Sequence, residues 1–345
     1  MAKYDEREIT QPVLLCDAKG ALNPDAVGWS RFPLHTCNLS GHFPRKKKWH
    51  FWNVLNEDYA IAFTIANVDY LGVGAIQLIK FKDKQKFDGA AVIPRGLGVK
   101  MPDKVEENVS LKDSMMKLSF THEPGKVLIK ASSPAVMGKP LEADITLDKP
   151  ADHETLNVVI PWGPEEFHFT SKQNTLPASG TVKYGDETLV FKPENAYGVL
   201  DFGRGMWPKT IYWNWGAFNH RQDGDLIGIN IGSKWTDNTG QNENGICLNG
   251  KLYKIMEDLD FKYDTSNFMA PWRIRTPETD MMDLTLTPAY ENAGGGSGGG
   301  ADGEKKAAAS NHQMYGYYNG VLKAGGRTIN VKNAFGWAEE HIGNW

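Results

Sequence analysis

The sequence contains few cysteines and no long hydrophobic segment. Its 345 residues include three cysteines, Cys16, Cys37 and Cys247, an odd number that cannot form a disulfide framework. The longest apolar runs, such as residues 59–66, are far shorter than the ~20 residues that cross a bilayer as a helix. No apolar stretch follows the charged N-terminus, as a secretory signal would require. We therefore expect reduced thiols, no membrane insertion and a cytoplasmic protein.

The sequence also lacks an excess of positive charge and the motifs of common cofactor sites. It has 38 basic and 42 acidic side chains, for a net charge of -4, which excludes the basic surface of a typical nucleic-acid binder. It contains no phosphate-binding loop, no dinucleotide-binding glycine fingerprint and no Gly-x-Ser-x-Gly nucleophile turn. We therefore expect a small-molecule partner and no cofactor, and the composition leaves the oligomeric state open.

Four side chains of metal-binding type occur close together, at Cys16, His35, Cys37 and His42. Zinc ligands usually come as close pairs separated by a longer stretch, and this spacing fits none of the usual patterns. We expect no metal site there.

Aromatic side chains, in contrast, are abundant. There are 11 Trp, 12 Tyr and 15 Phe, and Trp is seldom needed for core filling alone because its buried N–H requires a partner. A ligand pocket is one explanation of the surplus. The other is a large β-protein, whose pleated surfaces favour aromatic residues.

Apolar and polar residues alternate along much of the chain, and a sustained 3.6-residue period is absent. Such alternation is typical of β-strands, and the clusters of Gly, Pro, Asn and Asp between them indicate turns. Asp88-Gly89, Asp223-Gly224 and Asn249-Gly250 predict turns, the last two as tight hairpins. The pattern predicts strands over residues 59–66, 74–81, 127–131, 156–160, 188–191, 211–218, 225–231, 245–248, 252–255, 282–287, 313–321 and 328–331.

This number of strands exceeds what one open sheet normally holds. It predicts an all-β protein with two antiparallel barrel or sandwich units packed on each other. The stretches 161–164 and 176–180, rich in turn residues, are the best boundaries. We expect an N-terminal β unit over residues 1–175 and a C-terminal β unit over residues 176–345 that carries most candidate site residues. Residues 294–303 are mostly glycine and predict a flexible surface loop between two strands.

The densest group of polar and aromatic residues begins at Asp201. Residues 201–207 read DFGRGMW, so two glycines flank Arg204 between an acid and an indole. Glycines in such a place suggest a close approach of backbone or ligand. The alternative is an Asp201–Arg204 pair that holds a turn.

The strand predicted over residues 225–231 and its extension to residue 234 have two unlike faces. One face carries Ile227, Ile229 and Ile231, and the other carries Gly228, Asn230, Gly232 and Lys234. A small polar face opposite a continuous apolar face indicates a strand beside a cavity, and a solvent-facing edge strand is the alternative. In a cleft, Asp237 and Glu243 of the following loop would serve as general acid and base.

The chain ends in GWAEEHIGNW. If this segment is extended, Glu339 and His341 share one face with Trp337, which would orient the imidazole for proton transfer. If it is a solvated tail, these residues have no such role.

Nine short segments, in order, resemble the domain-of-unknown-function 2804 family over nearly the whole chain. The resemblance implies a lipocalin-like protein of two β-barrel-like halves with a ligand pocket, distantly similar to carotenoid 1,2-hydratases and fungal lipocalin-like cyclases. Two departures from the family are Asn238, where Gly is usual, and the glycine-rich insertion near 294–303. The segments are GWSRFP (28–33), KKW (47–49), PASG (177–180), LDFGRGMWP (200–208), WNW (213–215), KWTD (234–237), EN (243–244), PWR (271–273) and GWAEEH (336–341).

We predict that Asp201 and Glu243 form a proton-transfer pair and that His341 tunes or relays a proton. Glu339 and Asp237 are further candidate catalytic residues. Arg204 and Lys234 would hold the substrate or stabilise negative charge. The predicted substrate-binding residues are Arg204, Trp207, Trp213, Asn214, Asn230, Lys234, Trp235, Asn244, Trp272, Trp337 and Glu340.

Three functions fit these residues. The leading prediction is an enzyme that uses carboxylate acid–base chemistry for hydrolysis or elimination on a polar, sugar-like molecule, because charged groups and Trp faces suit sugars. The alternative is a hydratase, isomerase or cyclase for an isoprenoid-like apolar ligand, in which an acid protonates an alkene and Trp shields a carbocation. The third is a non-catalytic lipocalin-like carrier, which has less need of ionisable groups.

Overall fold

The computed structural model describes residues 5–296 and 309–344, and these form two compact units. The N-terminal unit comprises Arg7–Trp207 and Asn249–Lys251, and the C-terminal unit comprises the described parts of Met1–Glu6, Pro208–Leu248 and Leu252–Trp345. The described residues contain one 3-10 turn, η1 (Pro24–Ala26), and no α-helix. The all-β prediction is therefore confirmed. Within the same residues, no helix has the length and apolar character needed to cross a membrane.

The N-terminal unit is built on a 13-stranded sheet whose main path runs β7-β6-β5-β4-β15-β13-β11-β10-β9-β8, and the remaining members are β2, β12 and β14. A separate parallel pair joins β1 (Val13–Leu14) to β3 (His35–Thr36). The strands of the large sheet are β2 (Trp29–Ser30), β4 (Lys46–Leu55), β5 (Tyr59–Asn67), β6 (Leu71–Lys80), β7 (Gln85–Pro94), β8 (Val109–Lys112), β9 (Lys117–Glu123), β10 (Lys126–Val136), β11 (Lys139–Asp148), β12 (Leu156–Pro161), β13 (Phe167–Tyr184), β14 (Glu187–Phe191) and β15 (Tyr197–Met206).

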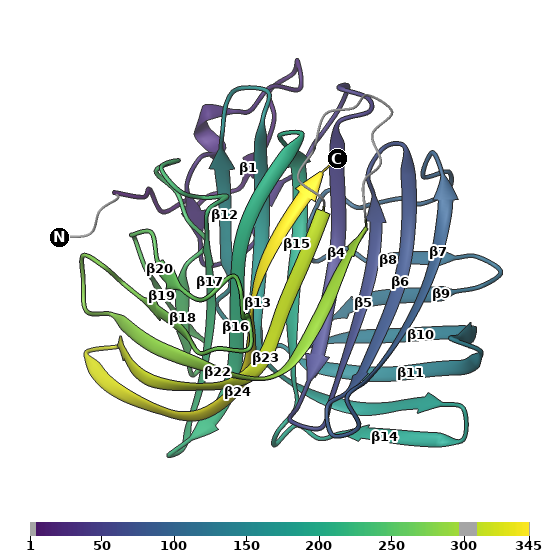
Figure 1. The fold of residues 1–345 in the computed structure, drawn as a ribbon. Helices are drawn as coiled ribbons and strands as arrows, with labels where there is room; N and C mark the ends of the chain where they lie inside the picture. Colours follow the sequence, from purple (N-terminus) through teal and green to yellow (C-terminus); the bar gives the residue numbers. More distant parts are fainter. Residues whose placement is uncertain (1–4, 297–308, 345) are drawn as a thin grey trace. The chain divides into compact units, whose positions relative to one another are not determined.

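This sheet folds over its own core. Figure 1 shows β4 to β7 running across the direction of β9 to β11. Side chains from both sets, including Trp52, Phe63, Phe120 and Ile129, belong to one buried cluster. Two crossed layers around a shared core are the orthogonal form of a β-sandwich.

The C-terminal unit is a nine-stranded antiparallel sheet in the order β19-β18-β17-β16-β24-β23-β22-β21-β20. Its long strands β22 to β24 are strongly curved (Figure 1), and the predicted isoleucine face of Ile227, Ile229 and Ile231 lies in its core. The strands are β16 (Thr210–Gln222), β17 (Asp225–Ser233), β18 (Gly245–Leu248), β19 (Lys251–Lys254), β20 (Asp260–Lys262), β21 (Trp272–Arg275), β22 (Met282–Gly296), β23 (Ala309–Ala324) and β24 (Arg327–Asn344).

The division of the chain differs from the sequence-based one. The expected boundary between residues 175 and 176 falls inside β13. Strand β13 pairs with β15 over most of its length, so both belong to the N-terminal unit, whose main segment ends at Trp207. The turn residues at 161–164 connect β12 to β13, two paired strands of the same unit.

Two of the three predicted turns are confirmed. Asp223-Gly224 and Asn249-Gly250 have positive φ at both positions and join β16 to β17 and β18 to β19, as expected of tight hairpins. The turn predicted at Asp88-Gly89 is wrong, because both residues lie inside β7. A Cβ at Gly89 would lie 3.1 Å from a Val136 methyl group, so a close approach explains that glycine better than a turn.

The predicted glycine-rich loop falls largely outside the described residues. Its first residues, Gly294–Gly296, end β22 and pair with residues 309–311 of β23. Residues 297–303 lie outside the described part of the chain.

Candidate functional site

Asp201 faces a lysine on the neighbouring strand. Its partner in the β13–β15 register is Lys172, and the Lys172 Nζ lies 3.0 Å from the Asp201 Oδ1. The Thr170 hydroxyl donates to the same oxygen at 3.2 Å. The side chains of Lys172 and Asp201 are 6% and 18% exposed, so this ion pair is largely withdrawn from water, with its carboxylate the more accessible member.

Aromatic rings lie next to this pair on the same face. Gly203 provides the room, because a Cβ there would come within 2.2 Å of the Trp49 ring and 2.7 Å of His168. The Trp207 indole donates to Nδ1 of His168 at 2.9 Å, and His168 stacks on Trp49 with centroids 4.7 Å apart. Burial, together with the charge of Lys172, holds the pKa of His168 well below its usual range, so the imidazole is neutral.

Arg204 points to the opposite face of β15. Asp201 and Arg204 are three residues apart in an extended strand, so their side chains diverge, and the pair considered from the sequence is not formed. The guanidinium is fully buried and donates to the backbone carbonyls of Pro102, Trp49 and Gly203 at 2.7–3.2 Å. Burial lowers the pKa of Arg204 to about 9.

In the C-terminal unit, the end of β24 carries a carboxylate and a neutral histidine on one face. Glu339 accepts hydrogen bonds from Nε1 of Trp213 at 2.9 Å and Nε2 of Gln313 at 3.0 Å. His341 stacks on the same Trp213, with centroids 3.8 Å apart, and its Nδ1 lies 3.2 Å from Oδ1 of Asn311. Burial lowers the pKa of His341 to about 4, so it is a neutral base at neutral pH.

The other face of β24 carries a second cluster. Lys234 Nζ lies 2.9 Å from Glu340 Oε2 and 2.6 Å from the Tyr263 hydroxyl, which donates to Glu340 and accepts from Asn214 at 3.1 Å. Tyr263 stacks on Trp272 at 3.9 Å. Hydrogen bonds from Tyr263 and Lys234 lower the pKa of Glu340 despite its partial burial.

The small face of β17 is covered by side chains of its own unit. A Cβ at Gly232 would lie 2.2 Å from Oε1 of Glu243, so the glutamate occupies that space. The same oxygen accepts from the Trp235 indole at 2.8 Å, and Asn230 donates to the Glu243 carbonyl at 2.7 Å.

Two further predicted residues, Asn244 and Asp237, accept hydrogen bonds from backbone N–H groups near β17. Asn244 Oδ1 accepts from the Gly232 N–H at 2.7 Å. Asp237 is exposed and accepts from the Lys234 N–H at 2.8 Å, which holds Lys234 at a φ of 72°. Trp337 is fully buried, with its ring 5.0 Å from that of Trp215.

The predicted site residues thus fall into separate groups. Asp201, Arg204 and Trp207 belong to the N-terminal unit, and the others to the C-terminal unit, so the Asp201–Glu243 pair stays a prediction. Sequence reasoning missed Lys172, Thr170, His168, Tyr263, Asn311 and Gln313. The alternation in FHFTSK (167–172) could have revealed the first three, because it places His168, Thr170 and Lys172 on one face.

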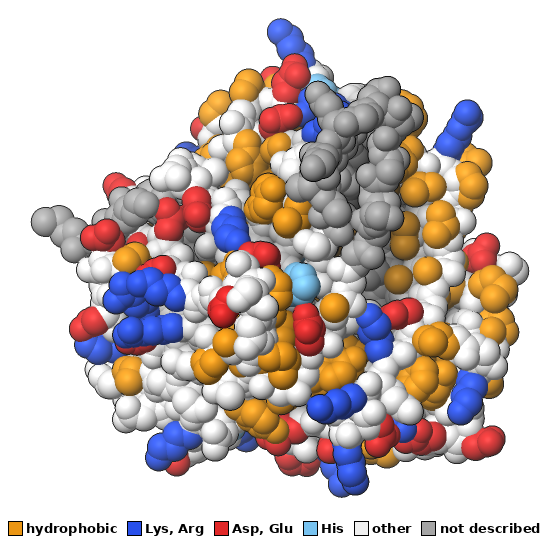
Figure 2. Space-filling view, viewed as in Figure 1, with side chains coloured by type: hydrophobic (Ala, Val, Ile, Leu, Met, Phe, Trp, Pro, Cys, Tyr) orange, Lys and Arg blue, Asp and Glu red, His pale blue; other side chains and the backbone are white. Residues whose placement is uncertain are grey.

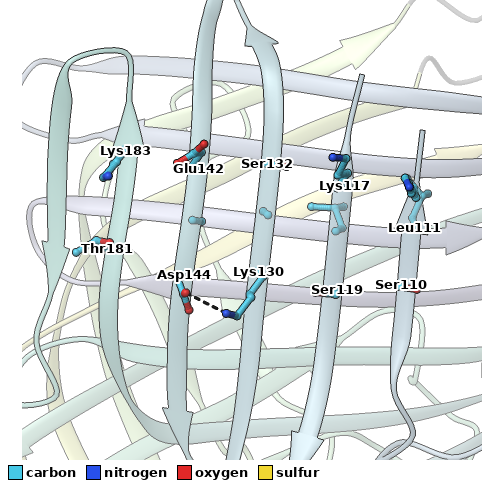
Figure 3. Close-up of a pocket in the computed structure, with 14 residues that line it drawn as sticks. Ser110, Leu111, Lys117, Ser119, Lys130, Ser132, Glu142, Asp144, Thr181 and Lys183 are labelled. Carbon is cyan, nitrogen blue, oxygen red and sulfur yellow. Dashed lines mark ion pairs between the residues drawn. The ribbon is translucent and has the colours of Figure 1, made fainter. Parts of the chain in front are cut away.

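Two hollows lie on the N-terminal unit. A groove of about 710 Å³ crosses β8 to β11 and β13 (Figure 3), and exposed charged side chains such as Lys117, Lys130 and Glu142 line it. A smaller hollow of about 340 Å³ lies over β4 to β7 and is lined mainly by small and apolar side chains, with Phe51 at one side. Among the described residues, no three His, Cys, Asp or Glu side chains are placed to share a metal ion.

The chain belongs to a family described as "Domain of unknown function (DUF2804)", whose model matches residues 6–345. This confirms the family resemblance found in the sequence. No curated protein sequence matches the chain significantly.

Solved structures share the fold. The crystal structure of CghA with Sch210972 is 14% identical to this chain, with a TM-score of 0.56 over 87% of this chain and 89% of CghA. Kievitone hydratase from Nectria haematococca is 12% identical, with a TM-score of 0.51 over 87% of this chain and 90% of the hydratase. At these identities the likeness shows the fold alone, and it confirms the lipocalin-like prediction.

Proposed function

We propose that this protein is an enzyme of the hydratase kind, which adds water to a carbon–carbon double bond of a small, mainly hydrophobic molecule or removes it. The observation that carries the proposal is the Lys172–Asp201 pair, an ammonium 3.0 Å from a carboxylate with both side chains mostly out of water. A carboxylate held within reach of an ammonium and partly accessible is a group that can take up and return a proton at one place.

The chemistry needs only these groups and water. The oxygen of water forms a bond to one alkene carbon, the C=C π bond breaks, and the other carbon takes up a proton. Asp201 would accept the proton that the water loses and return it to that carbon, so no oxidant or reductant is required. The alkene would therefore be one conjugated with a carbonyl group, so that the electron pair of the broken π bond moves to the carbonyl oxygen, where the charge of Lys172 would stabilise it.

Two further features favour this reaction over sugar hydrolysis. The face beside Asp201 is aromatic, with Trp49, His168 and Phe51, and the nearby hollow is mainly apolar. The fold is shared with a protein named as a hydratase. The sugar-like substrate and the carrier function stay predictions that the same experiment addresses.

The test is incubation with geranial, whose C=C bond is conjugated with an aldehyde, and with cellobiose in ¹⁸O-labelled water, followed by mass spectrometry. A product of geranial that has gained one molecule of labelled water supports the proposal. Hydrolysis of cellobiose alone would support the sugar reading, and binding without any product would support a carrier.

Asp201→Asn keeps the shape of the side chain and removes the base, so it should lower the rate of label incorporation about 10²-fold or more. Asp186→Asn, at an exposed acid in the turn between β13 and β14, is the matched control and should leave the rate unchanged. Equal rates for wild type and Asp201→Asn would contradict the assignment.

A further inference from the structure

The hollow over β4 to β7 lies in line with the Lys172–Asp201 pair. The strand registers place Asp201 opposite Phe51, Phe51 opposite Thr64, Thr64 opposite Ala75, and Ala75 opposite Ala90. Directly opposed residues in antiparallel strands point to the same side of the sheet. One row across the N-terminal sheet therefore runs from the ion pair, past a phenylalanine, to the small side chains of the hollow.

The hollow exists because this part of the sheet face carries small residues. Ala62, Thr64, Ala75 and Ala90 line it, in positions where strands usually carry larger branched or aromatic side chains. Its volume of about 340 Å³ lies within the range of small-molecule sites. Figure 2 shows hydrophobic side chains over β6 and β7, with charged ones at the margins.

Two polar side chains of the hollow, Gln77 and Asp88, are hydrogen-bonded to each other. Gln77 Nε2 donates to Asp88 Oδ1 at 2.8 Å, at the end of the hollow farthest from Asp201 in sheet order. A ligand that enters the hollow therefore meets mainly methyl groups and the Phe51 ring between two polar ends, with Lys172 and Asp201 at one end and Gln77 and Asp88 at the other.

The spacing of the residues in this row also indicates how long a ligand must be to reach the hollow from Asp201. Neighbouring strands lie ~4.8 Å apart, so Thr64 and Ala75 lie about 10 Å and 14 Å from Asp201. The Lys172–Asp201 pair carries no net charge, which favours a neutral oxygen at the ligand's polar end, because a carboxylate would meet Asp201.

We propose that the hollow binds the hydrocarbon body of an elongated neutral molecule, such as an isoprenoid alcohol or carbonyl compound, whose oxygen reaches Lys172 and Asp201. This inference rests on the proposed function and names its substrate class. A ligand that reaches only to Phe51 would gain little from the hollow, whereas one of about 10–15 Å would fill it.

The experiment is isothermal titration of the full chain with prenol, geraniol and farnesol, which carry the same hydroxyl on increasingly long bodies. Geraniol should bind at least about tenfold more tightly than prenol, because its second isoprene unit is buried in the hollow. Equal affinities for the two alcohols would overturn the inference.

Ala75→Leu fills the hollow and should weaken geraniol at least about tenfold while leaving prenol within about twofold. Ala90→Leu, on the exposed strand β7, is the second variant should Ala75→Leu fail to fold. Ser132→Leu, in the charged groove of Figure 3, is the matched control and should change neither affinity. Unchanged geraniol binding in a folded Ala75→Leu or Ala90→Leu protein would show that geraniol does not bind in the hollow.

The hydratase activity and the binding site in the hollow can be tested independently of each other. Asp201→Asn removes the base but not the hollow, so it should lower turnover about 10²-fold or more and keep the preference for geraniol over prenol. If the preference for longer alcohols is found without any turnover, the binding site stands and the hydratase proposal fails. If labelled water is incorporated at a rate that does not depend on the length of the ligand, the hydratase proposal stands and the binding site in the hollow fails.

Discussion

The imidazole of His341 lies parallel to the indole of Trp213, with ring centroids 3.8 Å apart and ring planes inclined by 8°. The indole covers one face of the imidazole. The imidazole Nδ1 lies 3.2 Å from Oδ1 of Asn311, within hydrogen-bond distance. Trp213 at the same time donates its indole proton to Glu339. One tryptophan therefore fixes both the histidine and the carboxylate that the sequence indicated as candidate catalytic residues.

His341 should titrate far below an ordinary histidine. Burial disfavours its charged form and lowers its pKa to about 4. Nitrogen-15 NMR of the imidazole should show the neutral ring with its proton on Nδ1 down to about pH 5. Asn311→Leu should mix the two neutral tautomers. A titration midpoint of His341 near 6.5 would contradict this description.

Gly232→Ala should destabilise the C-terminal unit. The new Cβ would lie 2.2 Å from Oε1 of Glu243, and overpacking of this kind costs about 1–3 kcal/mol. Urea unfolding would measure the loss, and Gly232→Ala combined with Glu243→Ala should be less destabilised than the sum of the single variants. Gly163→Ala, where a Cβ meets nothing within 4 Å, is the control and should change stability little.

Stability should fall as the solution is acidified from pH 6.5 towards pH 4. His35 is buried, and this burial lowers its pKa to about 4. Above pH 6.5 the histidine is neutral in both states, and between pH 6.5 and 4 the unfolded chain binds a proton that the folded protein does not. The loss from this residue is about 3 kcal/mol and is complete below pH 4.

The matching variant is His35→Phe, which keeps an aromatic ring beside Phe169 and cannot titrate. Urea unfolding between pH 7.5 and 4.5 should show a shallower pH dependence in this variant than in the wild type. Parallel pH curves for the two proteins would show that His35 does not contribute to the acid sensitivity.

The buried pair of Glu6 and Lys254 should be essential to the C-terminal unit. The two side chains are 0% and 2% exposed and 2.8 Å apart, and Asn242 donates to the carboxylate. Burial lowers the pKa of Lys254 to about 8. Glu6→Gln leaves the ammonium without its counter-charge and should cost ~3–5 kcal/mol in unfolding experiments.

The double variant Glu6→Gln with Lys254→Met removes both charges, so it should regain part of that loss. If Glu6→Gln alone unfolds at the same urea concentration as the wild type, the pair has no stabilising role.

Local pattern determined much of the fold. The alternation of Ile227, Ile229 and Ile231 with small residues specified a strand with one buried face, because successive side chains of a strand point to opposite sides. Asp223-Gly224 and Asn249-Gly250 specified hairpins, because only such residues adopt positive φ twice in succession at low cost. These features depend on a few neighbouring residues, so the sequence alone was enough to predict them.

Tertiary structure decided what local pattern could not. Asp88-Gly89 reads as a turn, yet Gly89 lies within β7 against Val136, a contact 47 residues along the chain. The sequence predicts Asp201 as a site residue, but its partner Lys172 is set by the register between β13 and β15. The two are 29 residues apart, and no local spacing encodes such a register.

The sequence by itself therefore determined that this protein is built of β-strands, where several of its hairpins turn, and which acids and aromatic residues deserve testing. The tertiary structure decided which groups meet: Asp201 with Lys172, His341 with Trp213 and Asn311, and Glu340 with Lys234 and Tyr263. The physical reason is that strand formation is driven by alternation within a few residues, whereas side chains from different strands are brought together only by pairing and burial over the whole unit.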